Sequence, residues 1–392
     1  SDLCVVSQFT YRTTDGVYGP TGLGILQGSK AVFLIPRSPL GGGTYTASIH
    51  QPGQGDITWS FSIPGPPPPV PAGGTVKVHV SNTPNATVLG NLTVVDARQD
   101  GFTTAYPCVE GLPDASNNNY VAGQTIPNFA VVRSDANGDL CIRASGSAHL
   151  LWDQVAATTS VGTGNAQRLL DTRPGAKPGA RSITKVHVTN TPNATVLGNL
   201  TIVDAAADGY DTVFPCASGL PDSSNSNYSA GQTIPIFTIA RADAAGDICI
   251  FTYSSAHLLW DQVGTTTSLT ASAPKRVLDT RRTGRVRGGT IVIFGAATST
   301  PGATVLGTLT VVDPSADGFT TAYPCGSDVP NASTNNYVAR RNIANFAAVK
   351  TDAQGRICVF TTADTDLIWD QVAVTNVISS STPSRLLDTR QG

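Results

Sequence analysis

Arg168-Leu-Leu-Asp-Thr-Arg173 is the stretch that decides how this chain is organised. Nearly the same residues return as Arg276-Val-Leu-Asp-Thr-Arg281 and as Arg385-Leu-Leu-Asp-Thr-Arg390. Three other motifs recur in the same order. They are Thr-Val-Leu-Gly at 87–90, 195–198 and 304–307, Pro-Cys at 107–108, 215–216 and 324–325, and Trp-Asp-Gln-Val at 152–155, 260–263 and 369–372. A period of about 109 residues is too long for a solenoid unit, so we expect three domains, each with its own core.

The composition favours strands over helices. Charged residues make up only 13% of the 392, Met is absent and Glu110 is the one glutamate, so the usual helix formers are scarce. Val76, Val78 and Val80 alternate with polar residues, which is the period of a strand with one buried face. Asn137-Gly138 separates two apolar runs, as a hairpin turn would. The chain is therefore predicted to be all-β.

The repeat boundaries predict a modular chain. Residues 1–63 do not match the repeat, and their short apolar runs suggest a small Ig-like N-terminal domain. A Pro-rich linker at 64–73 should act as a stiff spacer. Repeats at 74–173, 174–281 and 282–392, the last with a C-terminal strand, are each expected to form a disulfide-containing β-sandwich of jelly-roll type. These domains should lie in a line.

Six of the seven cysteines fall at matching places in the repeats. We expect the disulfides Cys108–Cys141, Cys216–Cys249 and Cys325–Cys358, each spanning 33 residues. A metal site is the rival explanation, but no close Cys-x-x-Cys pair occurs. Disulfides predict a secreted, extracellular or cell-surface protein, and the start at Ser1 fits a chain whose export signal has been removed. Cys4 is left over, as a buried thiol or an intermolecular bridge.

No catalytic, cofactor or metal site stands out, and an enzyme is not expected. Asp135-Ala-Asn-Gly-Asp139 begins like a calcium loop, but its twelfth position is Gly146, so a hairpin turn is favoured. His149 and His257 lie near Trp-Asp pairs, but Asp366 replaces them in the third repeat. The Asp and Arg of each Leu-Leu-Asp-Thr-Arg stretch are expected to form a bridge that fixes a strand or joint.

Charge and hydropathy exclude two classes of partner. The net charge is −2 and no basic face is visible, so a nucleic-acid partner is not expected. No run of about 18 apolar residues occurs, so no membrane span is expected. Possible glycosylation sequons lie at Asn85, Asn91, Asn193, Asn199, Asn227 and Asn331.

Four motifs together resemble a module found in tandem in secreted bacterial proteins, especially those of actinobacteria. They are Arg168 to Arg173, Asn117 to Thr125, His257 to Asp261 and Asp317 to Cys325. The likeness covers about residues 74–390 and implies a secreted or surface module without a specific activity. The third repeat departs from it, because Arg340-Arg341-Asn342 replaces Gly-Gln-Thr.

The C-terminal motif suggests an assembly hypothesis. Arg385, Leu386, Leu387, Asp388, Thr389 and Arg390 either close the third repeat or open a repeat that does not follow. In the second case this strand would complete the first repeat, or the N-terminal domain, of another molecule and give a head-to-tail filament. The N-terminal run Leu3–Thr10 is a second candidate donor. A monomeric adhesin or glycan-binding protein, with the repeats as a stalk, is the alternative.

Overall fold

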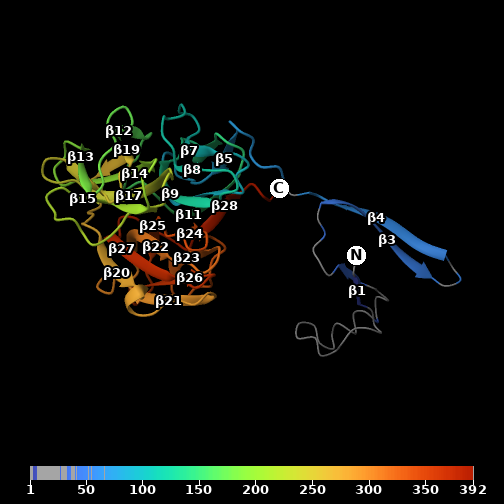
Figure 1. The fold of residues 1–392 in the computed structure, drawn as a ribbon. Coiled ribbons are helices and arrows are strands. Elements are labelled where there is room, and N and C mark those ends of the chain that lie inside the picture. Colours follow the sequence, from blue (N-terminus) through green and yellow to red (C-terminus); the bar gives the residue numbers. More distant parts are fainter. Residues whose placement is uncertain are drawn as a thin grey trace. The chain divides into compact units, whose positions relative to one another are not determined.

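Strands dominate both parts of the chain. The structure is a computed structural model that describes residues 3–6, 27, 33–36, 40, 42–51, 53, 55–65 and 67–391. The chain divides into one unit of Ser1–Pro67 with Gln391–Gly392 and a second unit of Pro68–Arg390 (Figure 1). Strands make up about 52% of the residues that the structure describes, which confirms the all-β class. No helix in the described residues is long and apolar enough to cross a bilayer.

The N-terminal unit is not the Ig-like domain that the sequence predicted. Strand β1 (Leu3–Val6) pairs with β2 (Phe33–Pro36), and β3 (Gly43–Gln51) pairs with β4 (Gly55–Ile63). Each pair is a separate two-stranded sheet, so its described residues do not form the two packed sheets that an Ig-like sandwich needs. The apolar runs at 45–49 and 57–63 lie in β3 and β4, but an apolar pattern does not decide how many strands join one sheet.

The second unit contains the repeats. The first repeat contributes β5 (Thr75–His79), β6 (Thr87–Val95), β7 (Gly101–Pro107), β8 (Asn118–Tyr120), β9 (Ile126–Arg133), β10 (Asp139–Ala144) and β11 (His149–Thr158). The next strands are β12 (Gln167–Asp171), β13 (Ser182–His187), β14 (Thr195–Val203), β15 (Gly209–Pro215), β16 (Ser226–Tyr228), β17 (Ile234–Arg241), β18 (Asp247–Thr252) and β19 (His257–Thr266). The last group is β20 (Lys275–Asp279), the 3-10 turn η1 (Thr280–Arg282), β21 (Thr290–Gly295), β22 (Thr304–Val312), β23 (Gly318–Pro324), β24 (Asn335–Tyr337), β25 (Ile343–Lys350), β26 (Arg356–Thr361), β27 (Asp366–Thr375) and β28 (Ser384–Asp388).

These strands form six four-stranded antiparallel sheets, and the prediction of three sandwich repeats in a line is wrong. The sheets are arranged as the six blades of a β-propeller. Their strand orders are β5-β10-β7-β8, β28-β11-β6-β9, β13-β18-β15-β16, β12-β19-β14-β17, β21-β26-β23-β24 and β20-β27-β22-β25. Radial repetition of this kind leaves only short, protected sheet edges. Each repeat therefore supplies most of two blades, not a domain of its own.

The Leu-Leu-Asp-Thr-Arg strand leaves its own repeat and joins the next. Strand β12 pairs with β19, and β20 pairs with β27. The last copy, β28, returns to the first repeat of the same chain and pairs with β11 (Figure 1). It covers the β11 edge, whose backbone groups would otherwise be open to another strand. The motif thus opens the following repeat, and the third copy closes the ring within one molecule.

The repeated motifs build two kinds of core. Trp152, Trp260 and Trp369 are fully buried. A Cβ on Gly90 would lie 2.8 Å from the Trp152 ring and 2.7 Å from the Asp153 carbonyl, which explains the glycine in Thr-Val-Leu-Gly. Residues of all three repeats share a further apolar cluster, in which the rings of Phe129, Phe237 and Phe346 contact one another with centroids 5.4–5.6 Å apart. This shared cluster is the physical reason that the repeats do not lie in a line.

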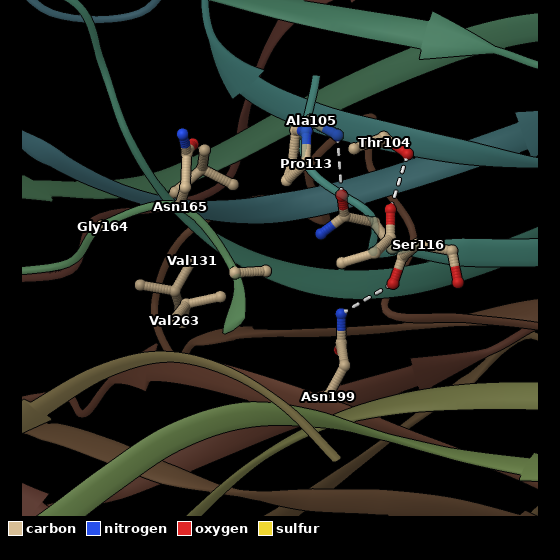
Figure 2. A pocket seen from close by; sticks show the side chains of 13 residues that line it. Thr104, Ala105, Pro113, Ser116, Val131, Gly164, Asn165, Asn199 and Val263 are labelled. Carbon is tan, nitrogen blue, oxygen red and sulfur yellow. Dashed lines mark hydrogen bonds between the residues drawn. The ribbon is translucent and has the colours of Figure 1, made fainter. Parts of the chain in front are cut away.

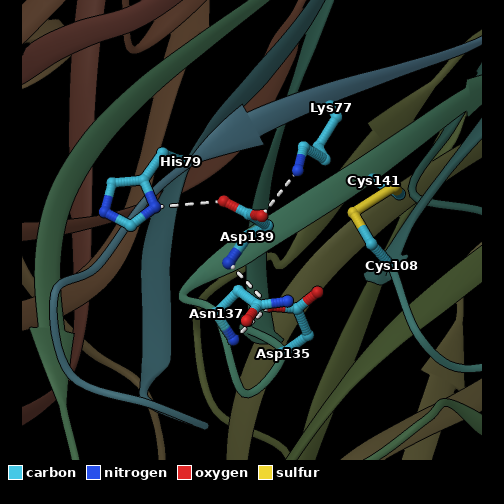
Figure 3. The surroundings of a disulfide bond; sticks show 7 residues. All are labelled: Lys77, His79, Cys108, Asp135, Asn137, Asp139 and Cys141. Carbon is cyan, nitrogen blue, oxygen red and sulfur yellow. Dashed lines mark hydrogen bonds and ion pairs between the residues drawn. A yellow bond between two sulfur atoms is a disulfide. The ribbon is translucent and has the colours of Figure 1, made fainter.

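The six repeat cysteines pair as predicted. The structure contains the disulfides Cys108–Cys141, Cys216–Cys249 and Cys325–Cys358. Each joins the residue that follows one strand to a residue inside its sheet neighbour, such as β7 to β10 (Figure 3). Cys4 lies in β1 opposite Ile35, and its side chain lies outside the described residues.

Candidate ligand-binding clefts

The first arginine of each motif is held by a buried carboxylate of another repeat. Arg385 donates to the two Asp153 carboxylate oxygens from Nε at 2.8 Å and from Nη2 at 2.9 Å. The same two-bond geometry joins Arg168 to Asp261 and Arg276 to Asp370. Burial raises the pKa of Asp153, and the bonds from Arg385 offset part of that effect. Every Trp-Asp-Gln-Val aspartate therefore receives the arginine of an incoming strand.

The second arginine forms the local bridge that the sequence predicted. Arg390 donates to Asp388 from Nε at 2.8 Å and from Nη2 at 2.6 Å, and Arg173 and Arg281 bind Asp171 and Asp279 in the same way. The Arg173 hydrogen bond lowers the pKa of Asp171 to about 2. Both arginines of a motif bind carboxylates through Nε and Nη2, and the Nη1 group of the first arginine faces the motif aspartate at 3.6–3.9 Å.

Two clefts lie where a motif meets the neighbouring repeat. One, of about 240 Å³, is lined by Arg385 and Arg390, by Phe319 and by the loop that contains Asn331. The other, of about 210 Å³, is lined by Arg276 and Arg281, by Tyr210 and by the loop that contains Asp222. The two linings correspond position by position in the repeat. We call them the 3–1 cleft and the 2–3 cleft, after the repeats that they join.

A third set of equivalent residues joins the first repeat to the second. The sequence places Phe102, Asp114, Arg168 and Arg173 at the matching positions. Asp261 is the main cause that raises the pKa of Arg168, and Asp114 contributes to the same effect, so Asp114 lies within electrostatic reach of that guanidinium. We name this place the 1–2 cleft only by its correspondence in sequence with the other two.

The loop of each cleft is held at fixed points. The Thr104 hydroxyl donates to the Ala115 carbonyl at 2.7 Å. Asn199 of the second repeat donates to the Ser116 carbonyl at 3.1 Å (Figure 2). Thr212 and Thr321 bind the matching carbonyls of Ser223 and Ala332. A cleft wall anchored to both repeats is prepared for binding without further ordering, which favours affinity.

The calcium-like stretch is a turn. Asp135 Oδ1 accepts backbone N–H bonds from Asn137 at 2.8 Å and from Asp139 at 2.9 Å, and the Asp139 carboxylate is paired with Lys77 and His79 (Figure 3). These oxygens are already bonded to donors of the chain. Among the described residues, no group of three or more His, Cys, Asp and Glu side chains is placed to hold a metal ion.

The histidines near Trp-Asp contact the threonines of the repeated motif. His149 lies 3.2 Å from the Thr389 hydroxyl, and His257 lies 3.2 Å from that of Thr172. Asp366 accepts from Thr280 at 2.9 Å, so the position holds the motif threonine in each repeat. Histidine and aspartate at this position therefore have the same role, which is to bind the threonine of the motif strand.

The sequons fall in different surroundings. Asn91 and Asn199 are buried, and their amide nitrogens donate to carbonyls of a neighbouring repeat. Asn85, Asn193 and Asn331 are exposed, and Asn227 is half-buried. Asn331 also lines the 3–1 cleft.

Sequence reasoning missed the clefts, although a signal was present. The loop Pro113-Asp-Ala-Ser116 recurs as Pro221-Asp-Ser-Ser224 and as Pro330-Asn-Ala-Ser333. A recurring surface loop beside the Pro-Cys motif marks a repeated site. The arginines of the site could not be predicted, because they come from a motif that lies some 50 residues away in sequence and whose strand pairs with a different repeat.

Comparison with known proteins identifies no family. No family model matches the chain, and no curated protein matches it. Two viral structures match at 10% identity and a TM-score of 0.21. One is the atomic structure of Sulfolobus turreted icosahedral virus, covering 85% of this chain and 91% of that one, and the other is the triple jelly roll fold and turret assembly of an archaeal virus, covering 85% and 90%. The tandem CBM22 domain of Paenibacillus barcinonensis Xyn10C matches at 11% identity and a TM-score of 0.17, covering 76% and 100%. Likenesses this weak carry no argument.

Proposed function

We propose that this chain is a non-enzymatic, extracellular glycan-binding protein whose ligands lie in the clefts between repeats. The observation that carries the proposal is the lining of the 3–1 and 2–3 clefts. Each combines two arginines with an aromatic ring, Phe319 or Tyr210, and with Asn and Ser side chains. Sugars present C–H faces that stack on aromatic rings and hydroxyl groups that bind polar side chains.

The cleft positions are built for presentation of polar groups, not for covalent chemistry. The arginines are fixed by carboxylates at their Nε and Nη2 atoms, so their remaining N–H groups point from a rigid frame. Repetition at three places around one ring suits a multivalent ligand such as a polysaccharide, because linked sites raise avidity without new contacts.

The disulfides support the proposed location. Three disulfides in a chain of this size are typical of proteins that fold in an oxidising compartment outside the cytoplasm. Glycans of cell surfaces and extracellular matrices are ligands available there. The resemblance to secreted bacterial modules agrees with this proposal but does not specify a ligand.

A glycan array probed with the full chain tests the proposal, followed by calorimetric titration of the best ligand. We expect Phe319→Ala and Tyr210→Ala each to weaken binding, and their combination to weaken it more. Trp59→Ala, on the exposed β4 ribbon, is the control and should bind normally. Loss of binding only in Trp59→Ala would place the site in the N-terminal unit and contradict the cleft proposal.

A filament subunit is the second candidate function. The observation in its favour is that β28 is the C-terminal strand and lies at the edge of its sheet, so an exchange of β28 between chains would make the same contacts. In the structure that strand is paired within its own chain, which removes the unpaired strand on which the filament hypothesis rested. Electron microscopy of concentrated full-length protein tests this candidate: fibres are expected if strands exchange, and uniform monomers would contradict it.

A further inference from the structure

The three clefts differ at one position that faces the arginines. The 1–2 cleft has Asp114 there and the 2–3 cleft has Asp222, whereas the 3–1 cleft has Asn331. Asn and Asp have nearly the same shape, so this difference changes the charge of the cleft and hardly its size.

Asp222 shows where a carboxylate belongs in such a cleft. Its Oδ1 lies 3.8 Å from Nη1 of Arg276, and its Oδ2 lies 3.9 Å from Nη2 of Arg282. Arg276 keeps its closer bonds to Asp370 while facing Asp222 with the remaining nitrogen. The Asp222 side chain is 89% exposed, so its carboxylate approaches the Arg276 guanidinium from the solvent side, as the carboxylate of a ligand would.

The 3–1 cleft has the same arginine arrangement without that carboxylate. Arg385 binds Asp153 through Nε and Nη2, and its Nη1 lies 3.6 Å from Asp388. Arg390 is 41% exposed and binds the same Asp388 through Nε and Nη2. With Asn331 in the loop, this cleft carries one acidic side chain fewer than either sister site. It retains cationic N–H groups and the half-buried ring of Phe319.

We infer that the 3–1 cleft selects a carboxylate-bearing sugar, with Arg385 and Arg390 binding its carboxylate and Phe319 packing against its ring. This inference rests on the proposed glycan-binding function and names the class of ligand. Asp114 and Asp222 reject the same ligand from the other clefts by like-charge repulsion, so one cleft of the three accepts it. The carboxylate comes from a uronic acid within a chain or from a terminal sialic acid.

Matched ligands and matched variants test the inference in protein produced by bacterial export, so that Asn331 is unmodified. The probes are tetragalacturonate and sialyllactose, each with its methyl ester, which keeps the sugar and removes the charge. Titration calorimetry of the full chain should show one site that binds an acid at least about tenfold more tightly than its ester, a difference of about 1.4 kcal/mol. Which acid binds distinguishes an internal uronic acid from a terminal sialic acid.

Two exposed positions allow substitutions that should not disturb folding. Asn331→Asp should remove the preference for the acid and leave ester binding unchanged, and Asp222→Asn should add a second acid site. Unchanged thermal unfolding is the folding control. Equal affinity for acid and ester, acid binding that survives Asn331→Asp, or no second site in Asp222→Asn would overturn the inference. If the protein still binds the esters in any of these three outcomes, the proposed glycan-binding function stands. If no glycan on the array binds, the proposed function itself is contradicted.

Discussion

Arg385 and Asp153 lie 232 residues apart in sequence and form a two-bond ion pair that closes the ring of blades. Asp153 is 1% exposed, and Arg385 brings β28 across to β11. The same pair joins Arg168 to Asp261 and Arg276 to Asp370 within the chain. The third motif thus makes with the first repeat the same ion pair that joins the other neighbouring repeats.

Removal of the Arg385 guanidinium should be costly. Arg385→Ala leaves the Asp153 carboxylate buried without its partner, and we expect a loss of about 3–5 kcal/mol in the free energy of unfolding. The control Arg98→Ala breaks an exposed pair with Asp96 and should cost at most about 1 kcal/mol. Urea unfolding followed by tryptophan fluorescence measures both, and equal losses would show that the pair does not stabilise the closure.

The glycine of Thr-Val-Leu-Gly should tolerate no side chain. Gly90→Ala places a Cβ against the Trp152 ring and the Asp153 carbonyl, and we expect it to cost about 1–3 kcal/mol through overpacking. Gly111→Ala is the matched control, because no atom lies within 4 Å of the added carbon. Near-ultraviolet circular dichroism should report a changed Trp152 environment in the first variant only. A stable Gly90→Ala protein would contradict the packing explanation.

Local pattern predicted the elements but not their partners. Alternation at Val76–Val80 marks β5, and Asn137-Gly138 marks the turn between β9 and β10, because both signals act over a few residues. The pairing of β28 with β11 depends on the whole ring. A strand with the sequence of β28 fits β11 of its own chain or of another equally well, so only the geometry of the ring decides between them.

The location of the core explains why the sequence predicted three separate sandwich domains in a line. Phe129 reads in sequence as a buried strand residue of one domain, but it packs against Phe237 and Phe346 of the other repeats. Burial can be predicted from the apolar pattern, whereas the identity of the covering residues cannot. For the same reason Asn128 could not be foreseen as an interface residue, although it accepts the Phe237 N–H at 3.0 Å.

Each disulfide should stabilise the chain by limiting its unfolded state. Cys108→Ser with Cys141→Ser opens a loop of 33 residues, and we expect a loss of about 3–4 kcal/mol. Excess dithiothreitol also breaks the two other disulfides in both proteins. Under these conditions the wild-type protein and the double variant should therefore be equally stable. A difference that persists under reduction would attribute the effect to packing of the cysteine side chains.

The second repeat carries a buried acid that its sisters lack. Asp211 and Ser226 lie opposite each other on β15 and β16, where the other repeats have Thr103 with Asn118 and Thr320 with Asn335, each pair hydrogen-bonded at 3.1 Å. Asp211 Oδ2 and Ser226 Oγ are buried without a hydrogen-bond partner among the described residues. Burial raises the pKa of Asp211 to about 7.

Stability should therefore fall as the pH rises from about 4 to about 7. The unfolded chain releases the Asp211 proton near pH 4, whereas the folded chain holds it until about pH 7, so between these values the folded state binds more protons. Relative to Asp211→Thr with Ser226→Asn, which restores the sister pair, the wild-type protein should lose roughly 1.4 kcal/mol per pH unit in this window and nothing further above it. Urea unfolding of both proteins at several pH values measures the difference. A constant difference across the window would mean that Asp211 titrates alike in the folded and unfolded chains, and that a bound water or a shifted side chain satisfies its carboxylate.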